Sequence, residues 1–187
     1  MNERFHTPTD KIQIGPHSPL VFLAGPVQGS PDWQTPTADI LLAARTDLEV
    51  ASPRRTIEHV GSFDANEAEK QVAWEHTALR RSAQLGAIII WLSAQDHALE
   101  YTKDRAYAQT TRIAIGEALG WARPVANLKN PDWDFPVNVG VDPRYSDNGG
   151  GSESYIRIKS KLLGIPVYDS LDQVIEETIR HVPRFGD

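Results

Sequence analysis

The chain has 187 residues, of which 40% are hydrophobic and 24% charged, enough for one domain with a substantial core and short for two. A net charge of −6 excludes the basic footprint that binds a nucleic-acid polymer, and the absence of cysteine excludes disulfides and thiolate chemistry. The longest apolar run, Ala87–Leu92, is far too short to cross a bilayer, and residues 1–10 carry no apolar signal core.

These limits predict a cytoplasmic protein with no membrane partner. We treat residues 1–187 as a single domain whose residues 1–18 form a polar N-terminal extension, because no internal repeat or composition change marks a boundary.

The first half of the chain alternates strand-like and helix-like segments. Leu20–Ala24 is a short apolar run closed by Gly25-Pro26, which is typical of a buried strand. A helix through Ile40 and a second strand at Leu48–Ala51 follow. A longer helix is predicted from Ala65 to about Ser82, where apolar residues recur every three or four positions.

The second half continues the alternation. Ala87–Leu92 is apolar without a polar face, as expected of a central strand covered on both sides. Ser93–Gln109 forms a long polar loop, and a helix over Thr110–Trp121 ends at Arg123-Pro124. Further strands are predicted at Val125, Phe135–Val141 and Ile165–Tyr168, and further helices at Ser152–Leu163 and Ser170–His181.

Strands that alternate with helices in this way predict an α/β fold, a doubly wound parallel sheet of about five strands with helices on both faces. Ligands of such sheets bind beyond the carboxyl ends of the strands. The loop after Ala24, the loop after Leu92 with the helix that starts at Thr110, and the region after Val137 should therefore meet at one site.

The residues of these segments have both structural and functional interpretations. Gly25 and Pro26 form either an ordinary strand-exit turn or a place where the backbone approaches a ligand closely. Thr110 and Thr111 either cap their helix or offer hydroxyl and N–H groups to an anion at its positive end. Trp33 lies in a polar loop, where its ring could stack on a base.

Five segments together carry a resemblance to a known family. They are Phe22-Leu23-Ala24-Gly25-Pro26, the tryptophan at 33, Gln71-Val72-Ala73-Trp74-Glu75, the strand ending Trp91-Leu92, and the helix that begins Thr110-Thr111 and continues to Gly116. In these segments the chain resembles the nucleoside 2-deoxyribosyltransferases and the related nucleotide N-glycosidases. The resemblance implies a flavodoxin-like domain that binds a nucleoside or nucleotide and assembles into a homo-oligomer with shared active sites.

The resemblance also implies site residues. Those expected to bind the substrate are Phe22, Gly25, Pro26, Gln28, Trp33, Thr110, Thr111 and, from a neighbouring subunit, Asn138. No cofactor is implied. The six histidines show no metal-ligand spacing, so no metal is expected either.

One position of the family pattern is occupied by an unexpected residue. The family's helix carries T-T-x-x-E-[LFI]-G, in which the glutamate attacks the sugar, and Ala114 stands in its place here. The helper aspartate expected near Leu85-Gly86 is also missing. Glu117 lies one helical turn beyond Ala114, but a displacement of about 5 Å disfavours it as a substitute nucleophile.

Three interpretations of Ala114 follow. The natural protein has glutamate there and this chain is inactivated for transfer of a 2-deoxyribosyl group between bases. Alternatively, the alanine is natural and the protein is a nucleoside or nucleotide sensor. A third possibility is a nucleotide N-glycoside hydrolase whose catalytic acid lies elsewhere, for example at Asp96 or Glu117.

The remaining candidates are weaker. Asp96, His97, Asp104 and Tyr107 lie in the long loop and could line a pocket, although charged loops are commonly just solvated. Glu75 follows Trp74 on the long helix, and adjacent helical residues point to different sides. That spacing predicts a surface position for Glu75.

Overall fold

A computed structural model describes residues 3–8, 12, 14–55, 65–99, 101, 106–129, 137–146 and 151–184 of the chain. Within these ranges, six strands form one parallel sheet in the order β1-β3-β2-β4-β5-β6. The strands are β1 Phe5–His6, β2 Leu20–Ala24, β3 Glu49–Ala51, β4 Gly86–Leu92, β5 Val137–Val141 and β6 Val167–Tyr168. The helices are α1 Gln34–Ala44, α2 Ala65–Leu85, α3 Gln109–Lys129, α4 Ser152–Leu162 and α5 Leu171–His181.

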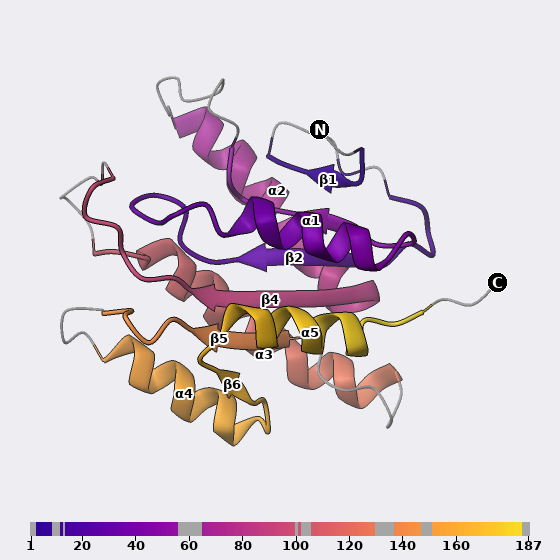
Figure 1. Ribbon diagram of the computed structural model, residues 1–187. Helices are drawn as coiled ribbons and strands as arrows, with labels where there is room; N and C mark the ends of the chain where they lie inside the picture. The colour runs from indigo at the N-terminus through magenta and orange to yellow at the C-terminus, as the bar shows by residue number, and fades with distance from the viewer. Residues whose placement is uncertain are drawn as a thin grey trace.

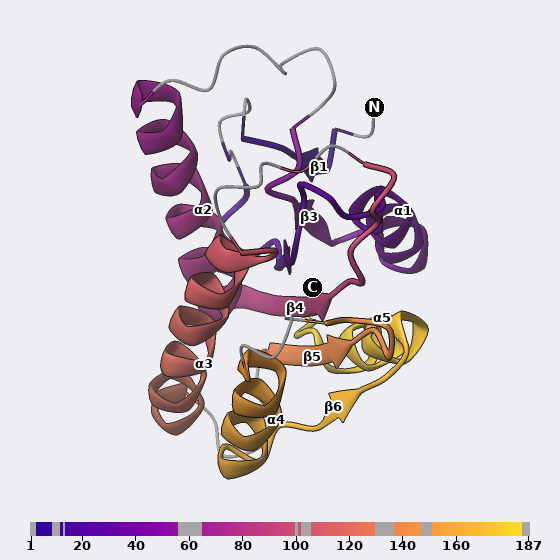
Figure 2. The ribbon, with the colours of Figure 1, turned by 90° about the vertical axis from the view of Figure 1, so that its left-hand side faces the viewer.

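Helices cover both faces of this sheet (Figures 1 and 2). The inward residues of α2 and α3 share one apolar cluster with alternate residues of the strands, among them Phe22, Ile88 and Val139. The intervening strand residues, such as Leu23 and Ile89, pack against α1 and α5 on the other face. Because successive side chains of a strand point to opposite faces, a strand buried on both sides needs an unbroken apolar run. The predicted doubly wound α/β fold is therefore confirmed.

The strand order places the expected ligand edge between β2 and β4. From β2 the chain winds outward first to β3 and then, on the other side, to β4, β5 and β6. The crossovers thus diverge at the β2–β4 junction, and ligands of open α/β sheets bind at the carboxyl edge of such a switch point. Parallel pairing holds Ala24 opposite Ile90, so both strands end at this edge.

Three sequence expectations were wrong in detail. Phe5–His6, inside the predicted polar extension, pairs with Val50 and Ala51 as the edge strand β1. Two residues are too short a run to show a strand period, and their pairing depends on the edge that β3 offers. The helix α3 does not end at Arg123-Pro124 but runs to Lys129, so Val125 is helical. A proline costs a helix one hydrogen bond and often bends it, and a long helix tolerates that loss.

The junction between α2 and β4 leaves no room for a side chain. The helix ends at Leu85 and the strand begins at the next residue, Gly86. A Cβ on Gly86 would clash with the backbone carbonyl oxygen of Leu20, which the pairing of β2 and β4 fixes in place.

Gly86→Ala should therefore lower the free energy of unfolding by about 3 kcal/mol or more, because a backbone obstacle cannot move aside as a flexible side chain does. Urea denaturation measures the change. The matched control is Gly120→Ala on α3, where a Cβ meets nothing within 4 Å. There alanine should be neutral or stabilise the helix by up to about 1 kcal/mol. Equal stability of the two variants would contradict the steric account.

Candidate active site

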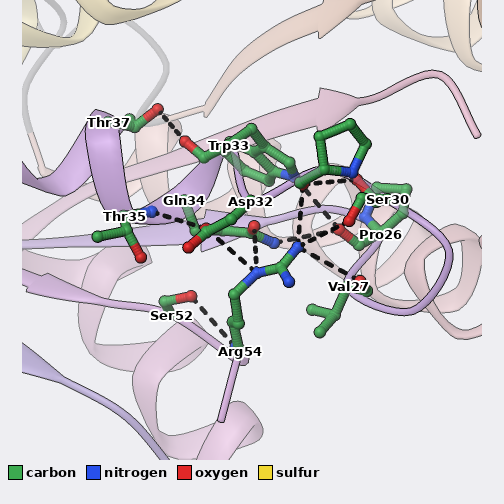
Figure 3. Close-up of polar contacts among 11 residues, drawn as sticks. Pro26, Val27, Ser30, Asp32, Trp33, Gln34, Thr35, Thr37, Ser52 and Arg54 are labelled. Atoms are coloured by element: carbon green, nitrogen blue, oxygen red, sulfur yellow. Dashed lines mark hydrogen bonds and ion pairs between the residues drawn. The ribbon is translucent and has the colours of Figure 1, made fainter. Parts of the chain in front are cut away.

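The loop after β2 is held in place by the side chain of Arg54 (Figure 3). Arg54 Nε donates to Gln34 Oε1 at 2.9 Å and lies 3.2 Å from a carboxylate oxygen of Asp32. Its Nη2 donates to the carbonyl oxygens of Val27, Ser30 and Pro31, at 3.0 to 3.3 Å. Burial lowers the pKa of the guanidinium, and the nearby Asp32 opposes that shift. One planar cation from the exit of β3 thus fixes the loop that leaves β2.

Gly25 and Trp33 form the other support of this loop. The indole of Trp33 is 6% exposed and its Nε1 donates to the carbonyl oxygen of Pro26 at 3.2 Å. A Cβ on Gly25 would clash with that indole ring and with the carbonyl oxygen of Trp91. Glycine is therefore required here for close packing between the two strand exits. The face of Trp33 is packed inside the fold instead of lying open for a base to stack on.

The loop after β4 is fastened to the loop after β2. The backbone N–H of Asp96 donates to the carbonyl oxygen of Gly29 at 2.8 Å. The phenol of Tyr107 donates to the carbonyl oxygen of Ser93 at 3.0 Å, and burial raises its pKa to about 12. Tyr107 therefore stays protonated at neutral pH and acts as a hydrogen-bond donor. Its ring also lies near that of Tyr145, which follows β5.

The helix α3 begins at this edge with an unusual backbone. Ala108, just before the helix, has a φ of 57°, in the left-handed region that residues other than glycine rarely adopt. Arg112 Nη2 donates back to the carbonyl oxygen of Tyr107 at 2.7 Å and so ties the helix to this turn. Backbone strain of this kind is concentrated at functional sites.

The sequence-predicted residues of α3 differ in burial and contacts. Thr110 is exposed, whereas Thr111 is buried against the sheet. Ala114 is half-buried and packs against the apolar cluster that contains Phe22 and Tyr107. Glu117 Oε1 lies 3.1 Å from Nδ1 of His76 on α2, so it forms a contact between the two helices.

The other residues predicted from the sequence as site residues have separate surroundings. Phe22 is 2% exposed and lies beneath Trp74 of α2, with ring centroids 6.3 Å apart. Gln28 and His97 are exposed, and Asp96 Oδ1 accepts the N–H of Ala98 within its own turn. Asp104 lies outside the described residues.

Asn138 lies on the opposite face of the sheet from Ala114. Its amide donates to Thr178 Oγ1 of α5 at 3.0 Å, and both side chains are buried. Within a single chain this amide is therefore satisfied internally. A contribution of Asn138 to the site of a neighbouring subunit stays a prediction.

Glu75 is the residue whose surface position was wrongly predicted from the sequence. It is half-buried, and burial raises the pKa of its carboxyl, although the Gln71 amide and the charge of Arg55 partly oppose that shift. Gln71 Nε2 donates to Glu75 Oε1 at 2.8 Å, and Arg55 Nε donates to Gln71 Oε1 at 2.8 Å. A chain of hydrogen bonds therefore links the exit of β3 to this carboxyl.

The spacing along α2 could have revealed the position of Glu75. Gln71, Glu75, Ala78 and Ser82 are separated by four, three and four residues and form one stripe on the helix. Ala78 and Ser82 are fully buried against the sheet. The stripe is thus fully buried in the half of α2 nearer β4 and half-buried, at Gln71 and Glu75, in the half nearer the carboxyl edge.

The site is therefore a strand-exit edge with a fixed loop, a strained helix start and a polar helix stripe. The model of the family described as "Nucleoside 2-deoxyribosyltransferase like" matches residues 18–113 of the chain. The chain belongs to this family. The matched residues contain β2, α1, β3, α2, β4 and the start of α3, and the match ends one residue before Ala114. No curated protein matches the chain.

Among the described residues, no helix is long and apolar enough to cross a membrane. In the same ranges, no three histidine, aspartate or glutamate side chains gather as metal ligands.

Arg54 holds the loop after β2 through several hydrogen bonds, so Arg54→Lys should destabilise the protein by about 2 kcal/mol. Lysine cannot reproduce the fork of donors, and the partly buried carbonyl oxygens of Val27 and Ser30 would lose their partner. Chemical denaturation measures this, and limited proteolysis should cut residues 26–33 faster. The control is Arg180→Lys, which alters an exposed pair with Glu177. Its effect should stay below about 0.5 kcal/mol. Similar losses in both variants would contradict the role of Arg54.

Proposed function

We propose that the chain binds a nucleoside or nucleotide at the carboxyl edge of β2 and β4 and carries the frame of an N-glycosidic bond-cleaving site. Family membership supports the substrate class. The position of Ala114, half-buried beside the cluster of Phe22 and Tyr107 near the start of α3, supports its place in that site.

The chemistry explains what the alanine removes. Departure of the base leaves oxocarbenium character at the anomeric carbon, which a carboxylate on the helix traps as a glycosyl-enzyme ester. An acceptor base then displaces the carboxylate and completes the transfer. Ala114 has no group that can form this ester, so transfer of a 2-deoxyribosyl group between bases is blocked in the chain as it stands. Bound substrate is therefore turned over slowly.

Ala114→Glu should restore base exchange by several orders of magnitude, because a missing nucleophile commonly costs several kcal/mol of barrier. Chromatography on deoxynucleosides, ribonucleosides and their monophosphates, with and without an acceptor base, measures transfer and hydrolysis separately. The control, Gly120→Glu, adds the same carboxylate to an exposed position of α3 with open space around its Cβ. This variant should behave like the unaltered chain.

The other outcomes separate the alternatives. Tight binding without cleavage in either protein would favour a sensor. Equal cleavage in both would favour a hydrolase that uses another residue. Absence of binding would overturn the proposed substrate class.

We further propose that the chain is a homo-oligomer, with the outer face of α2 as the contact. A surface depression of about 630 Å³ lies there, lined by Ala68, Glu69, Val72, Ala73, His76 and Thr77. Val72 is 66% exposed within it, so a partner that covered it would remove apolar surface from water. A second copy would cover this side chain next to the helix that carries Ala114.

Light scattering at micromolar concentration should therefore give a mass above that of one chain, and Val72→Lys should shift it toward the monomer. The charge would have to be buried without a partner, which disfavours association. Ile158→Lys on α4 is the control, since Ile158 is similarly exposed at 59% but distant in the fold. A monomeric unaltered chain would exclude the oligomer.

A further inference from the structure

The inward stripe of α2 places a carboxyl group beside the helix whose nucleophile position is occupied by Ala114. α2 and α3 are neighbours on the same face of the sheet (Figure 2), and both run opposite to the strand arrows, from its carboxyl edge to its amino edge (Figure 1). The contact between His76 and Glu117 marks one common level along the two helices. Counted from this contact toward the carboxyl edge, Glu75 is one residue away on α2 and Ala114 is three residues away on α3. As helix rise, these two positions differ by two residues, about 3 Å.

Both residues are half-buried, each beside the inward face of its helix. Ala114 and Glu117 lie on one flank of α3, three residues apart, and Glu117 faces α2. Glu75 belongs to the inward stripe of α2, next to Trp74, which covers Phe22 of β2. The Glu75 carboxyl is thus near the level of the missing nucleophile, over the strand from which the β2 loop departs.

The surroundings of Glu75 fit an acid–base group better than a structural ion pair. Among the described residues, Gln71 is the one that donates a hydrogen bond to Glu75; Arg55 donates to Gln71, and its charge also lowers the pKa of the Glu75 carboxyl. His76 and Glu117, one residue further along this contact, pair with each other. Burial raises the pKa of the Glu75 carboxyl, which keeps a larger protonated fraction near neutral pH than a solvated glutamate has.

We propose that Glu75 is the acid–base catalytic residue of this site, protonating the departing base and then deprotonating the attacking water. In the first step the carboxyl proton moves to a ring nitrogen of the base, and the electron pair of the glycosidic C–N bond leaves with the base. In the second step a water oxygen bonds to the anomeric carbon, and a water proton returns to the Glu75 carboxylate. The net reaction is hydrolysis of the N-glycosidic bond. This inference rests on the proposed substrate class.

The test compares Glu75→Gln with the unaltered chain, and repeats the pair in the Ala114→Glu background. Glutamine keeps the size and the contact with Gln71 but cannot transfer a proton. Base release, followed by chromatography, should fall at least about 100-fold in both backgrounds, with nucleoside affinity changed by less than about threefold. The rate of the unaltered chain should fall as pH rises through the pKa of Glu75, and the residual rate of the variant should not follow pH in this way.

Glu176→Gln is the matched control, the same change at an exposed position of α5 on the opposite face of the sheet. It should leave the rate and its pH profile unchanged. Unchanged base release in Glu75→Gln, or nucleoside binding with no cleavage in either background, would overturn the role of Glu75 and leave the substrate class intact. Loss of the folded state, read by circular dichroism, would assign Glu75 a structural role and also overturn the proposal. Failure of the unaltered chain to bind nucleosides would overturn the proposed function itself.

Discussion

Parallel pairing of β2 with β4 is the constraint on which the rest of the structure depends. It holds Leu20 opposite Gly86 and Ala24 opposite Ile90, so the two strands end together and their loops must share one edge. The tight junction at Gly86 brings α2 directly into β4, and the clash-free contact at Gly25 lets Trp33 close over the strand ends. Every group of the candidate site is positioned relative to this pair of strands.

Much of this arrangement could be predicted from the sequence because burial on two faces leaves a plain signal. Leu20–Ala24 and Ala87–Leu92 are apolar without alternation, and the structure buries every residue of both runs. The edge strand Phe5–His6 leaves no such signal, since its two residues form a strand only through the partner that β3 supplies. The end of α3 was misplaced because a proline penalises a helix without forbidding it.

The site was harder to predict than the fold, since it depends on contacts between distant segments. A tryptophan in a polar loop suggested an open stacking surface, but Trp33 is packed over Gly25 and bonded to Pro26. A lone glutamate beside Trp74 suggested solvent exposure, because adjacent helical residues diverge by about 100°. The buried face of α2 is wide enough to include both, as the stripe from Gln71 to Ser82 demonstrates. If polar residues had been counted together with apolar ones, the spacing of three and four residues along α2 would have placed Glu75 on its inward face.

The distribution of carboxyl groups over two helices has a chemical consequence. In the proposed reaction, a nucleophile on α3 would capture the sugar and an acid on α2 would assist departure of the base, and these are separate demands on the site. Loss of the first group removes the covalent intermediate that base transfer requires, yet leaves protonation of the departing base untouched. Water can then capture the sugar, since a small solvent molecule needs no dedicated binding pocket of its own. If Glu75 acts as proposed, alanine at position 114 therefore suppresses transfer more strongly than hydrolysis, and the residual activity of the chain is that of an N-glycosidase.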